Sequence, residues 1–185
     1  MENLFIYILL PLIAIVLIWY ISASNRLKRY RVVIDESKRN VDIALTKRYD
    51  TISEMIKVAK SYAKHEAETF ANIIKLRQSG SISESNQAIK NQNEAIERIY
   101  ALAESYPELK SSEQFLNLQD QIDDENEQFA AAKRIVNNNI SIFNQQVVSF
   151  PTSIIAKSNG MTKMDFLVED DVAGKKSIEH FDYDV

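Results

Sequence analysis

The chain has 185 residues, with no cysteine, three glycines and three prolines. The absence of cysteine excludes a disulfide scaffold, thiolate catalysis and cysteine-bound zinc or iron–sulfur centres. So few glycine and proline residues also argue against a β-sandwich or barrel, which needs a turn about every 8–12 residues. The formal net charge of −4 argues against general nucleic-acid binding. The composition therefore favours long helices and no nucleic-acid partner.

The first apolar segment covers residues 4–21 and contains no charged residue. As a helix it would be roughly 27 Å long, close to the hydrocarbon thickness of a bilayer. Trp19 and Tyr20 stand at its end, where aromatic rings favour the headgroup boundary. We therefore predict that residues 1–23 form an N-terminal transmembrane anchor.

Two other interpretations of this segment compete with an anchor. A cleaved signal peptide needs a basic flank before the apolar run and small residues after it. The small residues 22–24 would suit cleavage, but Glu2 is the only charged side chain before the run. A buried core helix would be apolar on one face, whereas this segment is apolar on all faces. The anchor is the preferred interpretation, and cleavage stays open as the alternative.

Four basic residues directly after the apolar run predict its orientation. No acid occurs between the run and Asp35. The positive-inside rule then places the N-terminus outside and the remaining chain in the cytoplasm. We expect these side chains to lie among anionic lipid headgroups. They are Arg26, Lys28, Arg29 and Arg31.

The remaining chain shows apolar residues at three- and four-residue steps between widely spaced breakers, which is typical of amphipathic helices. The breakers are Gly80, Pro107, Pro151, Gly160 and Gly174. We predict four helices, at about 24–48, 52–78, 82–105 and 112–149. Each of the last three would begin at a capping box, in which a Ser or Thr and a Glu or Gln satisfy free backbone N–H groups. The boxes are Thr51–Glu54, Ser81–Glu84 and Ser111–Gln114.

The charge distribution and the tail complete the predicted organisation. The front half of residues 24–150 is basic and the back half is acidic, which suits helices packed side by side. Exposed ion pairs contribute only some tenths of a kcal/mol each, so apolar burial must hold such a bundle together. We expect an all-α fold with an anchor at 1–23, an antiparallel up-and-down four-helix bundle at 24–150 and an irregular, acidic tail at 151–185.

The sequence offers no recognisable catalytic, cofactor or metal site. His65 and His180 are the only histidines, and neither lies in a zincin or di-iron motif. Asp123, Asp124, Glu125 and Glu127 resemble a cation site only in composition, because neighbouring helix residues face different directions, so we interpret them as a solvated acidic face. We expect a protein that is not an enzyme and takes no cofactor or small-molecule substrate.

Two asparagines at the edge of the last apolar stripe are the remaining candidates from pattern alone. Asn137 and Asn144 are seven residues apart, so they share one helix face. A buried asparagine in a helical seam costs stability but can set the register or the choice of partner. A plain surface position is the competing interpretation.

Several segments strongly resemble the LemA family of bacterial membrane proteins. The most specific are Arg48-Tyr49-Asp50, Tyr62-Ala63-Lys64-His65-Glu66, Tyr106-Pro107-Glu108-Leu109-Lys110, Phe115, Leu118-Gln119 and Phe150-Pro151. The resemblance implies a single-pass anchor carrying a cytoplasmic four-helix bundle at the bacterial inner membrane. It implies no recognised catalytic residue and no defined biochemical activity. The family's association with membrane zinc proteases of the HtpX type makes such a protease a candidate partner.

The resemblance also changes how two positions are interpreted. A proline common in the family is Ser53 here, which weakens the predicted helix break near Asp50 and permits one continuous helix. His65 and Glu66 lie within a matched segment in mid-helix, so we place them with Asn137 and Asn144 in a candidate structural polar network.

We therefore expect a non-enzymatic interaction or scaffold protein of the cell envelope, which binds another membrane or envelope protein. The alternative is a peripheral lipid-organising module that binds anionic headgroups through its basic first helix. Salt-sensitive lipid binding would favour the alternative, because salt screens exposed charges.

Overall fold

The computed structural model describes residues 2–63 and 81–168, with side chains from Tyr7 onward. All regular elements in these ranges are helices, which confirms the all-helical prediction. They are α1 (Glu2–Tyr62), α2 (Ile82–Ser105), α3 (Pro107–Lys110), α4 (Glu113–Val148) and α5 (Thr152–Ser158).

Helix α1 runs without interruption for 61 residues, so the predicted break near Asp50 is wrong. The hydroxyls that would have capped a new helix have other partners. Ser53 Oγ donates to the carbonyl of Tyr49, one turn earlier in the same helix, at 2.7 Å. Thr51 Oγ1 donates to Glu125 of α4 at 3.0 Å. With no Gly or Pro between Pro11 and Gly80, nothing in the local sequence stops the helix there.

The other two capping boxes differ in outcome. The box at the start of α2 is confirmed, because the Glu84 amide donates to Ser81 Oγ at 3.2 Å and the Ser81 amide donates to Glu84 Oε2 at 2.9 Å. The box before α4 does not form, since that helix begins after Ser112, whose side chain makes no capping hydrogen bond. The predicted ranges of α2 and α4 are nevertheless confirmed to within a residue or two.

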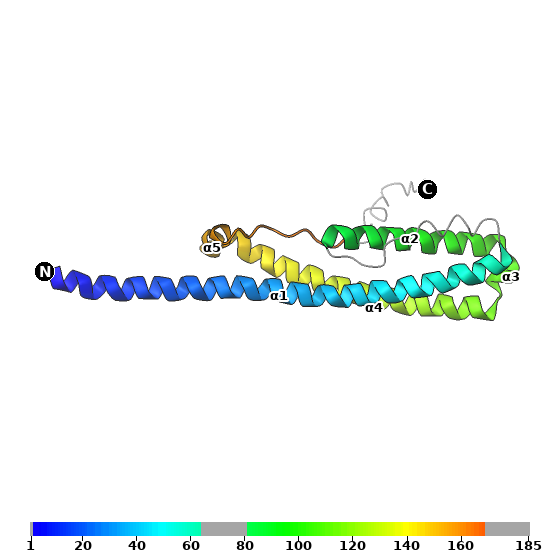
Figure 1. The fold of residues 1–185 in the computed structure, drawn as a ribbon, viewed down its shortest axis with the longest axis horizontal. Helices are drawn as coiled ribbons and strands as arrows, with labels where there is room; N and C mark the ends of the chain where they lie inside the picture. Colours follow the sequence, from blue (N-terminus) through cyan, green and yellow to red (C-terminus); the bar gives the residue numbers. More distant parts are fainter. Residues whose placement is uncertain (1, 64–80, 169–185) are drawn as a thin grey trace, which may run out of the picture.

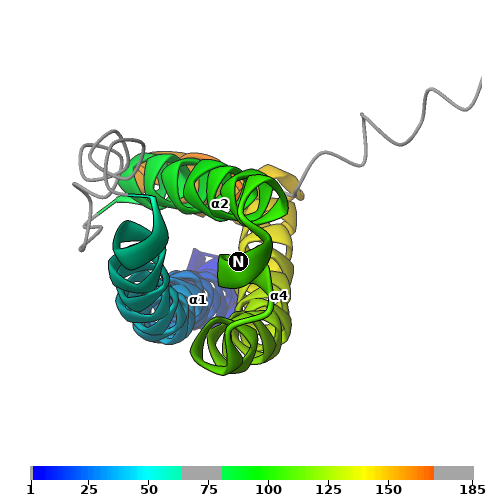
Figure 2. The same cartoon turned by 90° about the vertical axis from the view of Figure 1, so that its right-hand side faces the viewer.

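The long helices pack lengthwise (Figure 1). Helix α4 runs back along α1, and α2 lies beside them and points in the same direction as α1. The view from the end that carries α3 shows the three helices around a common axis (Figure 2). The helix predicted at 52–78 begins as the last part of α1, and its residues after Ala63 lie outside the described ranges.

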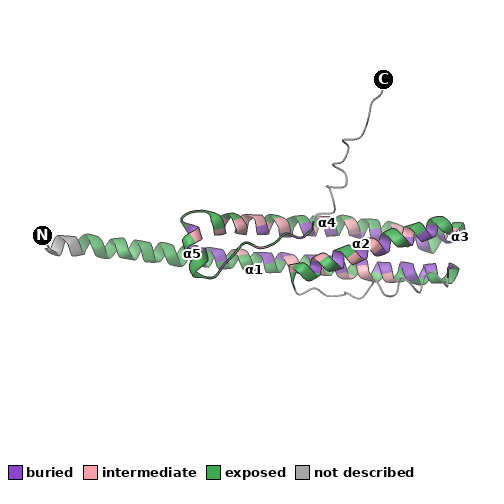
Figure 3. Cartoon of the chain, turned by 90° about the horizontal axis from the view of Figure 1, so that it is seen from above, coloured by how far each residue is buried: buried purple, intermediate pink, exposed green. Residues whose placement is uncertain are grey.

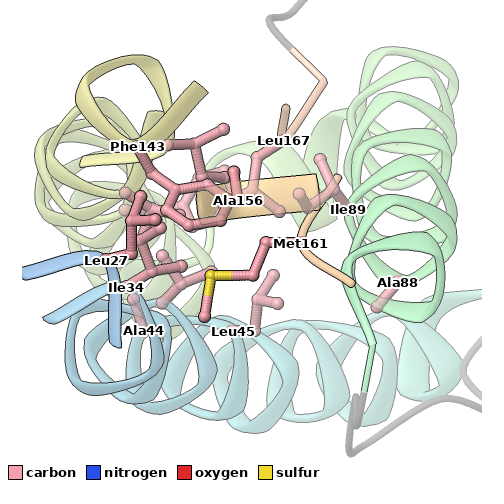
Figure 4. Packing of buried hydrophobic residues seen from close by; sticks show 14 of the residues in the cluster. Leu27, Ile34, Ala44, Leu45, Ala88, Ile89, Phe143, Ala156, Met161 and Leu167 are labelled. Atoms are coloured by element: carbon pink, nitrogen blue, oxygen red, sulfur yellow. The ribbon is translucent and has the colours of Figure 1, made fainter. Parts of the chain in front are cut away.

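The apolar core forms two clusters along this axis. The first joins α1 from Ala23 to Leu45 with the start of α2, the second half of α4 and residues beyond Pro151 (Figure 4). The second joins α1 from Ile52 to Ala63 with the rest of α2, Leu109 and the first part of α4. Phe115, Phe143 and Leu27 are among the fully buried side chains. Burial of each contributes about 2–3 kcal/mol, so these clusters supply most of the packing energy.

The chain beyond Pro151 is more ordered than predicted. Residues Thr152–Ser158 form α5, and Gly160 adopts a φ of 64°, which turns the chain back along the bundle. Residues 161–168, which we call the C-terminal strap, have no regular secondary structure. Met161 and Leu167 of the strap are nevertheless buried in the first cluster. The acidic end of the predicted tail, residues 169–185, lies outside the described ranges.

Candidate functional site

The N-terminal part of α1 extends beyond the packed part of the molecule (Figure 3). Every residue from Tyr7 to Ser22 is exposed, and burial begins at Ala23. Large side chains such as Ile8 and Ile18 are more than 60% exposed. Among the described residues, α1 is the one helix long and apolar enough to cross a membrane. In the described part of the chain, no other element covers the side chains from Tyr7 to Ile18.

The predicted basic cluster follows directly on the same helix. Arg26, Lys28, Arg29 and Arg31 are all exposed. Ala23, which precedes the cluster, and Leu27, which lies within it, are buried against the rest of the bundle. The cluster therefore surrounds α1 where the packed core begins and lies within three turns of the exposed apolar segment.

A buried polar layer separates the two apolar clusters. Arg48 of α1 is only 2% exposed. Its Nη2 donates to Asn93 Oδ1 of α2 at 2.9 Å, and its guanidinium carbon lies 4.8 Å from the centre of the Phe129 ring of α4. Lys133 Nζ lies 5.4 Å from the same ring centre. Two cations near one aromatic ring in a partly desolvated site gain cation–π attraction of about 0.5–2 kcal/mol each.

The layer continues around Glu125 of α4, which is 8% exposed. Its Oε1 accepts hydrogen bonds from Thr51 Oγ1 at 3.0 Å and from Gln121 Nε2 at 3.2 Å. In α2, Gln92 Nε2 donates to the carbonyl of Leu45 in α1 at 2.9 Å. The three long helices thus each contribute buried polar groups at the same level. A slip of one turn would place these groups against apolar side chains without partners, so the layer favours one register.

Two grooves flank this layer. One has a volume of about 560 Å³ and is lined by Lys47, Asp50, Thr51, Gln121 and Glu125 among others. The other, of about 540 Å³, includes Arg48, Asn93 and Phe129. Their linings mix acids, bases and amides, and in the described part of the chain no three His, Cys, Asp or Glu side chains gather as a metal site would require. The layer is suited to positioning helices and contains no recognisable nucleophile–base pair.

Glu125 corrects one prediction. We interpreted the run around it as a solvated acidic face, and Asp123, Asp124 and Glu127 are indeed exposed. Glu125 turns inward, because its position continues the buried stripe through Ile122 and Phe129. Its place at three- and four-residue steps in that apolar stripe is the sequence signal that could have identified it.

The predicted asparagines hold the C-terminal strap. Asn137 Nδ2 donates to the carbonyl of Leu167 at 3.0 Å, and its Oδ1 accepts from the Leu167 amide at 2.9 Å. Asn144 binds the Met164 carbonyl and amide in the same way, at 2.9 and 2.8 Å. Asn86 of α2 accepts from the Val168 amide at 2.9 Å. The strap is therefore held through its backbone, and the side chains of Met161 and Leu167 are buried in the first apolar cluster.

Of the predicted network of His65, Glu66, Asn137 and Asn144, only the two asparagines lie in the described ranges. His65 and Glu66 lie outside the described ranges. The two asparagines are half-buried and bind strap backbone, a use that the pattern of the helix alone did not indicate.

A model described as the LemA family matches residues 37–179. The chain belongs to the LemA family. The LemA match begins at Ser37, inside α1, and so includes the polar layer, both asparagines and the strap but not the exposed apolar segment or the basic cluster. A search of curated proteins finds no match to this LemA-family chain.

Proposed function

We propose that this LemA-family chain is a single-pass membrane protein whose helical bundle is an interaction scaffold at the cell envelope. The observation that carries the proposal is the continuity of α1. The same helix provides an apolar surface from Tyr7 to Ser22 and then one side of the buried core from Ala23 onward. Lipid around the first part would remove that apolar surface from water.

The basic cluster supports a cytoplasmic position for the bundle. Its four charges lie just beyond the apolar segment and precede Asp35, the first acid after that segment. Retention of such residues on the cytoplasmic side would leave the N-terminus outside the bacterial inner membrane. In the described ranges α4 runs antiparallel to α1 and α2, and we propose that this elongated helical bundle is the cytoplasmic part of the protein. The four helices predicted within 24–150 required a break near Asp50, which α1 does not have.

A scaffold role is supported by the way the buried polar groups are used. Arg48 binds Asn93 of α2 and Thr51 binds Glu125 of α4, so these buried groups hold neighbouring helices together. We propose that the bundle is not an enzyme and that it binds another membrane or envelope protein. The family resemblance makes a membrane protease of the HtpX type one candidate.

Fractionation and thiol labelling test the anchor and its orientation. Because the chain has no cysteine, Leu116→Cys creates a single exposed thiol at the end of the bundle far from the anchor. We expect the full-length protein to stay with membranes in carbonate and the thiol to react with an impermeant maleimide only after lysis. A mature product beginning near Ser24 that is released by carbonate would refute the anchor. Labelling of intact cells would refute the orientation.

Crosslinking in intact membranes tests the partner. A single envelope protein should be captured with the full-length chain, and its capture should resist high salt if an apolar or shape-specific surface binds it. Capture of no protein at all would contradict the scaffold function.

The exposed basic cluster supports a second candidate, a lipid-organising role. Replacing Arg26, Lys28, Arg29 and Arg31 together with glutamine should then abolish the enrichment of anionic lipids around the purified protein. Enrichment in the parent should also fall with rising salt, because exposed charges are screened within about 10 Å at 0.1 M. Unchanged lipid composition in the variant would exclude this role.

A further inference from the structure

The turn between α4 and α5 exposes three large apolar side chains at the anchor side of the bundle. Phe150 is 81% exposed, Ile154 is 60% exposed and Val148 is 54% exposed. We call these residues the α4–α5 corner. Their neighbours Ile155 and Ala156 are fully buried, so α5 is packed on one side and leaves the corner uncovered on the other.

Hydrogen bonds place α5 beside the end of the apolar segment of α1. Tyr20 Oη and Ser158 Oγ are 3.0 Å apart, and Asn159 Nδ2 donates to Ser24 Oγ at 3.3 Å. Ile154 shares a helix face with Ser158, because residues four apart lie above one another. The corner therefore lies near the level at which α1 changes from an exposed apolar helix to a packed one (Figure 1).

The stretch of chain that contains the corner carries only positive charges. Residues 128–164 contain no acid, and their exposed charged side chains are Arg134, Lys157 and Lys163, while Lys133 is buried in the polar layer. The facing part of α1 carries the basic cluster and likewise has no acid before Asp35. In these two described segments no acid lies between Ser22 and Ile34 or between Gln128 and Met164, which suits a surface of anionic headgroups.

One face of α1 has the same polarity change as a lipid interface. A groove of about 550 Å³ on this face is lined by residues of α1 alone, from Ile18 and Ile21 to Arg26 and Arg29 within three helical turns. An acyl chain and its phosphate would meet those two parts in the same order.

We propose that the α4–α5 corner is a second membrane contact, in which Phe150, Ile154 and Val148 enter the interfacial region of the bilayer next to the anchor. This proposal rests on the anchor of the proposed function and adds the surface that meets the lipid. Apolar side chains above a basic, acid-free surface are what interfacial segments use to bind anionic bilayers. Attachment at both α1 and the corner restricts rotation of the bundle about the anchor and keeps the α3 end away from the membrane.

Fluorescence quenching in proteoliposomes tests the contact with the full-length chain. Single cysteines at Val148, Ile154, Leu116 and Leu12 would each carry an environment-sensitive dye in vesicles of phosphatidylethanolamine and phosphatidylglycerol. Lipids with a nitroxide near the headgroup should quench the two corner dyes several-fold more than lipids with a nitroxide at the chain end. Leu12, inside the proposed anchor, should show the opposite preference. Leu116, 45% exposed at the far end of α4, should be quenched by neither.

The outcomes separate this proposal from the anchor itself. Corner dyes that behave like the Leu116 dye, while the Leu12 dye is quenched, would overturn the corner contact and leave the anchor intact. Corner dyes that stay unquenched in bilayers containing no other protein would instead favour a partner protein as the occupant of the corner. An unquenched Leu12 dye would refute the anchor.

A second variant tests whether the apolar side chains are the cause. Phe150→Ser with Ile154→Ser should abolish quenching of the Val148 dye, whereas Leu116→Ser with Ile135→Ser, which also removes two exposed apolar side chains from the surface, should leave it unchanged. Helical content measured by circular dichroism should equal that of the parent in both variants. Undiminished quenching of the Val148 dye in the serine variant of the corner would refute the proposal.

Discussion

Removal of the Asn137 side chain should free the C-terminal strap locally. Asn137 makes two hydrogen bonds to Leu167, at 3.0 and 2.9 Å, and Leu167 is 1% exposed. Asn137→Ala leaves the buried amide and carbonyl of Leu167 without these partners. At about 1 kcal/mol for each neutral hydrogen bond, the closed strap should lose about 2 kcal/mol relative to the open one.

Hydrogen exchange of the Leu167 amide measures this loss directly. Because tenfold corresponds to about 1.4 kcal/mol, exchange of that amide should become about 30-fold faster in Asn137→Ala. Amides in the middle of α4 should change little, since the strap opens without unfolding the helices. Asn138→Ala is the matched control, because Asn138 is the next residue of the same helix and is exposed.

Two results would refute this reasoning. One is an exchange rate at Leu167 that is the same in Asn137→Ala as in the parent. The other comes from a chain that ends at Gly160 and so has no strap. In that background Asn137→Ala should change the free energy of unfolding by less than about 0.5 kcal/mol. An undiminished cost would mean that Asn137 stabilises α4 by some other contact.

Three further changes test individual features of the fold. Burial and the nearby charge of Asp123 raise the pKa of Tyr100 from 10.0 to about 12. The stability that its neutral hydroxyl contributes is therefore complete below pH 10 and is lost as the pH rises through 12. In denaturant unfolding, the stability of Tyr100→Phe should rise relative to that of the parent between pH 10 and 12, and a constant difference would contradict this. Ser81→Ala should lower the free energy of unfolding by about 1 kcal/mol in thermal unfolding, because it removes the capping box of α2. Ser83→Ala, at an exposed position, should lower it much less, and equal losses would argue against the cap. Gly160→Ala should lower the free energy of unfolding by about 1 kcal/mol through its φ of 64° alone, since an added Cβ meets no atom within 4 Å. Gly160→Asn should lower it less. An alanine variant as stable as the parent would show that the turn relaxes.

The prediction of helix ends succeeded where the signal was local and failed where a distant residue intervened. Gly80 and Pro107 bracket α2, and its capping box forms within four residues of chain. The equivalent signal at Thr51 failed because its hydroxyl binds Glu125, 74 residues away, which no pattern near Thr51 reveals.

The candidate site divides in the same way. Arg26, Lys28, Arg29 and Arg31 are exposed, and their contact with anionic headgroups stays a prediction. The spacing of Asn137 and Asn144 correctly singled out one helix face, but their partner is a strap with no periodicity of its own. A pattern-based search finds helices, and it cannot find an extended segment that is ordered only by side chains from elsewhere.

The sequence by itself determined the helical class, the family, the apolar and basic segments of α1 and the ends of α2 and α4. All of these follow from residues within a few turns of one another, where backbone hydrogen bonding and side-chain periodicity decide the conformation. Only the tertiary structure decided the continuity of α1, the polar layer around Arg48 and Glu125, the strap and the corner beside Tyr20. These depend on which helix faces meet, and that choice is made by packing over the whole length of the bundle.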